Sequence, residues 1–285
     1  MPELPEVETV ARQLRPALIG RVIERVELLD RRAARGSPRP LSDCAGRRIT
    51  ALRRRAKFIL VELSGDGLLV FHLGMTGWLG VRAESAPAVA PPHLRACFFL
   101  GRAAADAAEE QQRLLFRDAR LFGRILCGPR DRLLAHPSLA ELGPEALELP
   151  AGDFVERLAA RRGRLKSLLL NQRFLAGLGN IYADESLHAA RLHPCESAGD
   201  VPPAAARRLH AAIQRILRRA LRAGGTTVRD FLSPAGQAGW FVRELRVYGR
   251  EGWPCRNCGA RIRRMVIAQR GAWFCPRCQK PDKRR

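Results

Sequence analysis

Four cysteines near the C-terminus constrain this fold more than any other feature of the sequence. Cys255 and Cys258 form one C-x2-C pair, and Cys275 and Cys278 form a second pair after an interval of sixteen residues. Within a cell this spacing is typical of a tetrahedral zinc site rather than of disulfides. Four thiolates leave the metal no open position, so the sequence predicts one structural Zn²⁺ that holds a short β-hairpin.

Arginines crowd the predicted hairpin. They are Arg261, Arg263, Arg264 and Arg270. This pattern favours contacts with a nucleic-acid backbone or groove, and a zinc ribbon that contacts another protein is the alternative. The remaining cysteines are interpreted as ordinary reduced thiols: Cys44, Cys97, Cys127 and Cys195.

The charge of the chain favours a polyanionic partner. Lysine and arginine together number 50 and aspartate and glutamate 28, which gives a formal net charge of +22. Nucleic acid is the first candidate for a partner of so basic a protein, and an anionic membrane surface is the second. The sequence has no apolar run long enough to span a membrane and no charged leader before an apolar segment, so we expect a soluble, intracellular protein.

The first half of the chain predicts a helix followed by a β-sandwich or barrel. Apolar residues at helical spacing predict an amphipathic helix over residues 5–19. Short strands, separated by glycine and proline clusters, are predicted at 21–29, 48–53, 57–63, 68–73, 94–100, 114–117 and 124–126. Many short strands without helices between them are typical of a sandwich or barrel.

The second half predicts helices. Asp153 is expected to cap the first helix, with Glu156 completing a capping box. Further helices are predicted at 165–172, at 180–190 and from 202 to about 223, the last with an arginine-rich face that is interpreted as solvated. The fold class is therefore α+β and multidomain. Its predicted boundaries are 2–142, a linker at 143–152, 153–244, 245–280 and a basic tail at 281–285.

The N-terminus offers a nucleophile. If Met1 is removed, Pro2 carries a free secondary amine next to the carboxylate of Glu3. An α-amino group titrates near pH ~7.7–8.0, so part of it is unprotonated at neutral pH and can form a Schiff base. Glu3 could then move the protons. The alternative is that Pro2 only permits removal of Met1 and that Pro5 only begins a helix.

Several other segments carry signals that are weak on their own. The segment 177–180 could bind a phosphate at the start of the helix for which Asn180 is the expected N-cap, or it could simply be a tight turn. Lys57 enters a strand, where a lysine is usually exposed. Met75 is either a core residue or an apolar wedge for a base stack. Arg120 and Phe122 would point to the same side of an extended segment.

Taken together, these segments resemble the formamidopyrimidine-DNA glycosylases of the Fpg/Nei superfamily over nearly the whole chain. The shared motifs are PELPEVET at 2–9, RRAK at 54–57, HLGMTG at 72–77, GLGNIYADE at 177–185, GGTT at 224–227, VYGR at 247–250 and the four-cysteine finger. The resemblance implies a bifunctional DNA glycosylase and AP lyase that removes oxidised purines and cuts the strand by β,δ-elimination. It also implies a helix-two-turns-helix domain and an FPG-type zinc finger.

The resemblance implies catalytic roles for a small set of residues. Pro2 would be the Schiff-base nucleophile and Glu3 the proton donor and acceptor. Lys57 would assist β-elimination, and Arg270 the second elimination. The loop at 226–241 would close over the damaged purine, and its first residues are Thr226, Thr227, Val228 and Arg229.

The resemblance also implies contacts with damaged double-stranded DNA. Met75, Arg120 and Phe122 would fill the space left by the flipped-out nucleotide. Asn180 and Arg270 would bind phosphate. Two further residues fall at DNA-contact positions of the family: His93 and Arg162. A monomer in the bacterial cytoplasm, associated with the nucleoid when bound to DNA, is expected.

The chain departs from the family pattern beside the expected wedge. Ala119 and Leu121 stand where the family usually has proline and arginine. This departure bears on the substrate range and not on the reaction type. One alternative is an endonuclease VIII-like glycosylase for oxidised pyrimidines. Another is a zinc-containing DNA-binding paralogue without catalytic activity.

Overall fold

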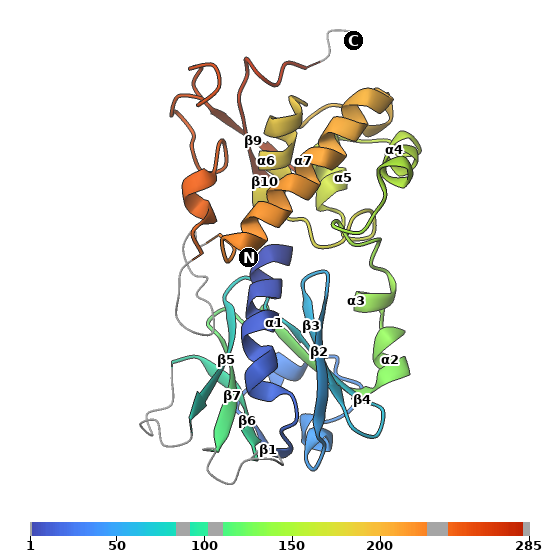
Figure 1. The fold of residues 1–285 in the computed structure, drawn as a ribbon, viewed down its shortest axis with the longest axis vertical. Helices are drawn as coiled ribbons and strands as arrows, with labels where there is room; N and C mark the ends of the chain where they lie inside the picture. The colour runs from blue at the N-terminus through green and yellow to red at the C-terminus, as the bar shows by residue number, and fades with distance from the viewer. Residues whose placement is uncertain (1, 84–91, 102–110, 227–238, 282–285) are drawn as a thin grey trace. The chain divides into compact units, whose positions relative to one another are not determined.

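The protein divides into two compact units, which are described separately (Figure 1). The computed structural model describes residues 2–83, 92–101, 111–226 and 239–281. The first unit comprises Met1–Glu141 and Gly224–Trp240, and the second comprises Leu142–Ala223 and Phe241–Arg285. The segment that follows the longest helix of the second unit therefore returns to the first unit.

The first unit begins with helix α1 (Leu4–Leu18), one residue earlier than the sequence predicts. Glu3 is its N-cap residue, and Glu3 and Glu6 form a capping box, in which each side chain accepts a hydrogen bond from the backbone N–H of the other. Val7, Val10 and Leu14 recur at helical spacing and are fully buried. Pro16 lies inside the helix, which nevertheless continues for two more residues.

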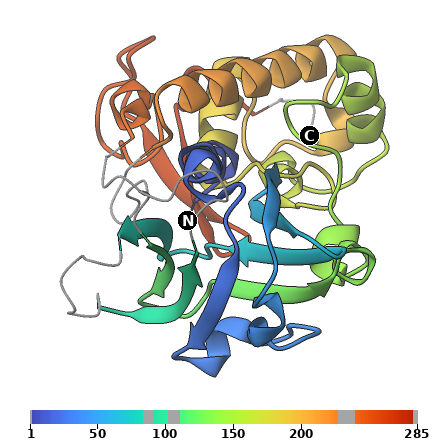
Figure 2. The same ribbon diagram turned by 60° about the horizontal axis from the view of Figure 1, so that its bottom comes forward.

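Two four-stranded antiparallel sheets form the β-sandwich predicted from the sequence. One sheet has the order β1 (Ile23–Leu28), β6 (Leu94–Leu100), β7 (Gln112–Asp118) and β5 (Gly77–Ala83). The other has the order β2 (Ile49–Arg55), β3 (Phe58–Leu63), β4 (Gly67–His72) and β8 (Arg124–Pro129). Figure 2 views α1 nearly along its axis, with strands of the sandwich beside it. Helix α1 packs against β2, β3 and β5.

Strand β5 was absent from the sequence prediction because its glycines were interpreted as turn residues. Gly77 and Gly80 instead lie in the strand, and β5 pairs with β7 along its whole length. A Cβ atom on Gly80 would lie 2.3 Å from the Trp78 ring, so glycine makes room here for the neighbouring side chain. Tertiary pairing overrides the local preference of glycine for turns.

Short helices complete the first unit. The 3-10 helices η1 (Arg31–Ala34) and η2 (Leu41–Cys44) lie between β1 and β2. Helices α2 (Arg130–Leu134) and α3 (Pro137–Ala140) follow β8 and were not predicted. The core is formed by the inward faces of both sheets and by α1, and includes Val7, Leu14, Ile59, Phe71 and Phe98.

The second unit contains the predicted helices, with two corrections at their starts. They are α4 (Ala151–Ala159), α5 (Leu165–Leu170), α6 (Asn180–Ala190) and α7 (Pro203–Arg222). Asp153 does not cap α4. The helix begins at Ala151, its N-cap residue is Pro150, and Asp153 lies in its first turn. Asn180 is the first residue of α6, and Gly179 is the N-cap residue.

Two short 3-10 helices and a hairpin complete this unit: η3 (Ala198–Asp200), η4 (Phe241–Glu244), β9 (Arg263–Ile267) and β10 (Arg270–Phe274). Helix α6 packs against both α7 and β10. Among the described residues, no helix is long and apolar enough to cross a membrane.

Candidate functional site

The N-terminal carboxylate is held in a buried, defined position. Pro2 is buried, and Glu3 exposes only 2% of its surface. The Glu3 backbone N–H donates to Glu6 Oε2 at 2.8 Å, while the Glu3 carboxylate accepts the backbone N–H of Glu6. The capping box therefore fixes an acid next to the residue that would supply the amine.

Glu6 also binds the start of the segment that returns from the second unit. Its other oxygen, Oε1, accepts the backbone N–H of Thr226 at 2.7 Å. Gly225 has a φ of +86°, and a Cβ there would lie 2.9 Å from the same oxygen, so this close approach requires glycine. Thr226 forms an isolated bridge with Trp240, which brings together the two ends of the predicted loop. Thr227, Val228 and Arg229 lie outside the described residues.

Replacing Glu6 with alanine is expected to lower the free energy of unfolding by about 2–6 kcal/mol, because two buried N–H groups lose their acceptor at roughly 1–3 kcal/mol each. Urea denaturation of the zinc-loaded protein measures the change. Arg12→Ala, on the exposed face of the same helix, is the control, because its ion pair with Glu8 is exposed and should contribute little. An unchanged denaturation midpoint for Glu6→Ala would contradict this role.

Lys57 lies at the turn between β2 and β3 and, unlike most lysines that begin a strand, is buried, with 6% exposed. Ala56 before it has a φ of 51°, in the left-handed region, so the turn is tight. Glu8 of α1 pairs with Arg54 across 3.1 Å, which joins the first half of the helix to this end of β2. Burial, reinforced by the Lys57 charge, lowers the pKa of His72 to about 4, so His72 is neutral at physiological pH.

Asp118 holds the two predicted wedge loops together. Its Oδ1 accepts the Thr76 hydroxyl at 2.5 Å and the Arg120 N–H at 3.2 Å, and its Oδ2 accepts the Gly123 N–H at 2.7 Å. Asp118 is itself fully buried. One carboxylate thus fixes both the loop that carries Met75 and the turn that carries Phe122.

The predicted wedge residues lie on this pair of loops. Met75 and Phe122 are exposed at 40% and 55%, unusual for large apolar residues, and the Arg120 guanidinium lies 5.8 Å from the Phe122 ring centroid. A Cβ on Gly74 would lie 2.5 Å from the Phe122 backbone, so the loops are in close contact. His93 is exposed, and its carbonyl accepts the Asp118 N–H at 3.0 Å. Arg120 and His93 therefore contact Asp118 through their backbones, and Met75 and Phe122 are next in the chain to its partners Thr76 and Gly123.

In the second unit, Gln172 fixes the turn before α6. Its side-chain Nε2 donates to the Leu178 carbonyl at 2.7 Å, and its Oε1 accepts the Gly177 N–H at 3.0 Å. Asn180 follows as the first helical residue, where backbone N–H groups have no partner within the helix. Arg162 is exposed in the connection between α4 and α5. A helix start can bind a phosphate, and Asn180 is the first residue of this helix rather than its cap.

Arg270 is exposed where β10 begins, directly after the hairpin turn. Ala268 and Gln269 form the turn with φ of 46° and 60°, the conformation that a two-residue hairpin connection requires. The arginine is therefore presented at the tip of the zinc hairpin.

The four predicted zinc ligands form one cluster. Their sulfurs all lie within 4.8 Å of one another. Individual Sγ–Sγ distances include 3.9 Å for Cys255–Cys278 and 3.4 Å for Cys258–Cys275. Zn–S bonds of about 2.3 Å in a tetrahedron place sulfurs about 3.8 Å apart, so the cluster fits one structural Zn²⁺. The Ala260 N–H lowers the pKa of the Cys258 thiol to about 7, whereas burial raises the pKa of the Cys275 and Cys278 thiols.

A fully buried ion pair supports the hairpin. Lys166 Nζ lies 2.7 Å from Asp184 Oδ1, and both side chains are completely buried. Lys166 also donates to the Gly271 carbonyl at 2.6 Å, and Asp184 Oδ2 accepts the Trp273 N–H at 3.1 Å. Helices α5 and α6 thus fix the strand that begins with Arg270.

The next residue of α6 fixes the chain that leads to the zinc site. Glu185 accepts the backbone N–H groups of Arg246, Val247 and Tyr248, each at 2.9 Å. Burial raises the pKa of Glu185, although these three N–H groups oppose the rise. Gln279 completes the attachment, since it accepts the Cys275 N–H and donates to the Leu192 carbonyl, both at 2.9 Å.

Sequence reasoning from the residues missed these supporting side chains, because most of them bind groups far along the chain, and Gln172 binds within a turn whose geometry has no sequence signal of its own. The missed residues are Glu6, Asp118, Lys166, Gln172, Asp184 and Glu185. The only available signal was a charged residue among apolar ones at a helical position expected to be buried, as Lys166 is among leucines.

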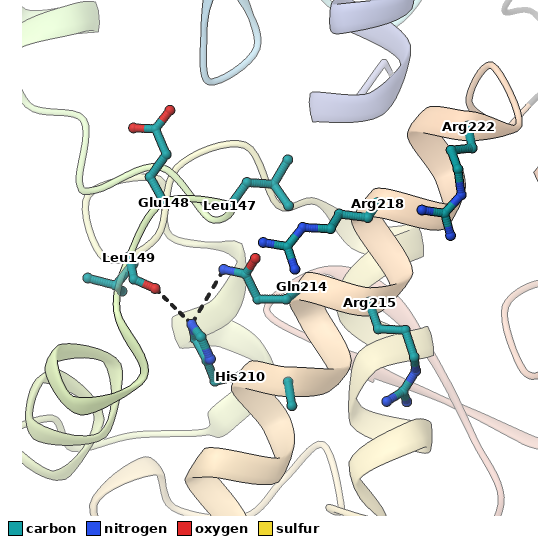
Figure 3. A pocket seen from close by; sticks show the side chains of 9 residues that line it. Leu147, Glu148, Leu149, His210, Gln214, Arg215, Arg218 and Arg222 are labelled. Carbon is teal, nitrogen blue, oxygen red and sulfur yellow. Dashed lines mark hydrogen bonds between the residues drawn. The ribbon is translucent and has the colours of Figure 1, made fainter.

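A large hollow of about 610 Å³ lies along α7 (Figure 3). Arg215, Arg218 and Arg222 line it, and His210 Nε2 lies 2.8 Å from the Leu149 carbonyl oxygen at its base. The predicted catalytic residues do not line this hollow. The other arginines of this helix face are exposed, as predicted: Arg207, Arg208 and Arg219.

The predicted site residues therefore fall into two groups, one on each unit. Three protein-family models match the chain: the formamidopyrimidine-DNA glycosylase N-terminal domain at residues 1–125, the formamidopyrimidine-DNA glycosylase H2TH domain at 142–232, and the zinc finger found in FPG and IleRS at 252–281. A formamidopyrimidine-DNA glycosylase of Heliobacterium modesticaldum is 44% identical, covering 98% of this chain and 100% of the relative.

Solved structures show the same similarity. The MutM (Fpg) protein of Thermus thermophilus is 41% identical with a TM-score of 0.85, over 98% of this chain and 99% of that one. The Lactococcus lactis Fpg in complex with abasic-site DNA is 32% identical with a TM-score of 0.87, over the same shares. Complexes of the Lactococcus lactis protein with Fapy-dG containing DNA and with an oxidised-pyrimidine containing DNA match equally well.

A β-sandwich with a helical N-terminus, joined to a helical unit that carries a four-cysteine hairpin, defines a class of DNA-repair glycosylases. The chain belongs to the formamidopyrimidine-DNA glycosylase family, and it is a DNA glycosylase of base excision repair.

Proposed function

We propose that this enzyme is a bifunctional glycosylase and AP lyase that removes oxidised purines from double-stranded DNA through a Schiff base on Pro2. The observation that carries the proposal is the buried carboxylate of Glu3, fixed by the capping box beside the residue that bears the amine after removal of Met1. A protein that only bound DNA would not need the Pro2 amine and the buried Glu3 carboxylate next to each other.

The reaction begins with attack of the unprotonated Pro2 nitrogen on C1′ of a flipped-out nucleotide. The nitrogen–C1′ bond forms, the glycosidic bond breaks, and the base leaves with a proton. A secondary amine can give only a charged iminium, which acidifies the neighbouring carbon and allows the 3′ and then the 5′ phosphate to leave. Glu3 donates and accepts the protons, Lys57 assists the first elimination, and Arg270 assists the second.

The remaining site residues would hold the DNA. Flipping a nucleotide costs a few kcal/mol and is least costly for a damaged, poorly stacked base. Met75 and Phe122 would fill the vacated space, and Arg120 would contact the orphaned partner base. His93, Arg162 and Asn180 would bind the backbone, and Thr226, Thr227, Val228 and Arg229 would belong to the loop over the lesion.

The proposed organisation follows from these roles. Residues 2–142 would form the catalytic domain, 153–244 the DNA-binding helical domain with the loop at 226–241, and 245–280 the zinc finger, between a linker at 143–152 and a basic tail at 281–285. We propose that the enzyme acts as a monomer in the bacterial cytoplasm, on the nucleoid.

The covalent step is tested by borohydride reduction of the enzyme with a duplex that contains 8-oxoguanine. We expect a stable protein–DNA cross-link whose peptide begins at Pro2, and a greatly reduced yield from Pro2→Gly, whose primary amine lacks the ring. Intact mass before the reaction should show that Met1 is absent. No cross-link, or an undiminished one from Pro2→Gly, would overturn the mechanism.

One specific observation favours the second candidate, a preference for oxidised pyrimidines. The Lactococcus lactis Fpg is known in complex with an oxidised-pyrimidine containing DNA as well as with Fapy-dG containing DNA. The PELPEVET opening resembles the purine-specific branch. A panel of matched duplexes with 8-oxoguanine, formamidopyrimidine and an oxidised pyrimidine decides between them by relative kcat/KM.

A further inference from the structure

Two of the cysteines interpreted as ordinary thiols are in direct contact. Cys44 is the last residue of η2, and Cys127 lies on β8. Their Sγ atoms are 2.9 Å apart, although the residues are 83 positions apart in the chain. Cys44 is completely buried and Cys127 exposes 3% of its surface. The pair lies within the first unit and contains no zinc ligand.

Hydrogen bonds fix the backbone on both sides of this contact. The Cys127 N–H donates to the Ser37 hydroxyl at 2.8 Å, and the Cys127 carbonyl accepts the Arg39 N–H at 3.1 Å. The Cys44 carbonyl accepts the Arg47 N–H at 3.2 Å. A disulfide bond is about 2.05 Å long, so the sulfurs need to approach by less than about 1 Å.

One of the two thiols borders a hollow. A cavity of about 320 Å³ is lined by Cys127 together with Arg39, Asp43 and Arg47. The contact with the Cys44 thiol lowers the pKa of Cys127, although burial opposes this shift. The same contact raises the pKa of Cys44. Cys127 is thus the member of the pair that lines this cavity, whereas Cys44 does not line it.

We propose that Cys127 and Cys44 are a redox-active pair that hydrogen peroxide converts to an intramolecular disulfide. The Cys127 thiolate attacks one peroxide oxygen, the O–O bond breaks, and hydroxide leaves and takes up the thiol proton to become water. The Cys44 thiol then attacks the Cys127 sulfenic acid, the S–S bond forms, the S–O bond breaks, and a second water leaves. Two thiols are oxidised and one peroxide is reduced to two waters.

The disulfide would join two elements, η2 and β8, that are far apart in the sequence. Strand β8 is an edge strand of its sheet and begins directly after the Arg120–Phe122 turn. A cross-link to η2 closes a long loop, which restricts the unfolded chain more than the folded one. The oxidised enzyme is therefore expected to unfold at a higher temperature than the reduced enzyme. This inference does not depend on the proposed glycosylase chemistry.

The test treats zinc-loaded enzyme with a few equivalents of hydrogen peroxide, blocks remaining thiols with an alkylating reagent, and maps the unreduced peptides by mass spectrometry. We expect a linked pair of peptides containing Cys44 and Cys127 that is two hydrogens lighter than the separate peptides and separates on treatment with dithiothreitol. The thermal unfolding midpoint should rise with the cross-link and fall again on reduction.

Two cysteine variants test which thiols form the cross-link. In Cys44→Ser, dimedone should label Cys127 as a sulfenic acid, and the rise in unfolding temperature should disappear. Cys195→Ser, which removes a half-buried cysteine of the second unit, should leave the cross-link unchanged. Wild-type Cys44 and Cys127 that are still alkylated separately after unfolding, at a peroxide dose that already oxidises the zinc cysteines, would overturn the proposal.

Discussion

Glu3→Gln is expected to reduce strand cleavage at 8-oxoguanine by roughly 10²–10⁴-fold, the usual contribution of a positioned general acid and base. Glutamine keeps the size of the side chain and can still accept the backbone N–H of Glu6 through its carbonyl oxygen. The substitution therefore removes proton transfer while leaving the start of α1 in place. Single-turnover cleavage of a lesion duplex measures the effect.

The control for this prediction is Glu24→Gln, an exposed carboxylate on β1 of the same unit. It should cleave at the wild-type rate. Glu3→Gln should bind the lesion duplex within a few-fold of wild type, because the amide leaves the DNA-contact residues unchanged. A cleavage rate within ten-fold of wild type would show that another group moves the protons.

Lys166→Met is expected to lower the free energy of unfolding by about 3–5 kcal/mol at pH 8, because it leaves the buried carboxylate of Asp184 without its partner. The loss of the bond to the Gly271 carbonyl should also loosen the hairpin that holds Arg270. Urea denaturation measures the stability, and release of zinc to a chromogenic chelator reports on the hairpin.

The loss of stability in Lys166→Met should be larger at high pH than at low pH. Burial raises the pKa of Asp184 to about 7, against an ordinary value of 3.8, even though Lys166 opposes the rise. Between these two values the folded state binds a proton that the unfolded state has released, so the Asp184 contribution to stability is lost as the pH rises through about 7. Without Lys166 the carboxyl group takes up a proton more readily, so the destabilisation should be smaller at pH 5 than at pH 8.

Two controls accompany this variant. Arg207→Met, on the exposed face of α7, should change the stability by less than about 0.5 kcal/mol. The double variant Lys166→Met, Asp184→Leu removes both charges and should recover much of the loss, since a well-packed apolar pair can replace a buried ion pair. A double variant no more stable than Lys166→Met would contradict the unpaired-charge explanation.

The elements of the fold were largely predictable because their signals are local. Helical spacing in Val7, Val10 and Leu14 predicted α1, and alternating apolar residues with glycine and proline between them predicted seven of the eight sandwich strands. Strand β5 was missed because its glycines resemble turn residues until β7 pairs with them. The start of α4 was misplaced, and Asn180 was wrongly assigned as the cap of α6, because the N-cap residues Pro150 and Gly179 make no side-chain hydrogen bond.

Residue types at fixed spacing were enough to predict the zinc site, most of the strands and helices, and the family. The groups that support the site became visible only in the folded chain: Asp118 between two loops, Glu6 on the Thr226 amide, and Lys166 with Asp184 beside the hairpin. The tertiary structure also decided that Cys44 and Cys127 touch. These pairs are up to 220 positions apart in the chain. A single charged residue or cysteine is not part of a repeating sequence pattern, so its partner cannot be predicted from spacing. The two residues come into contact only when the chain folds.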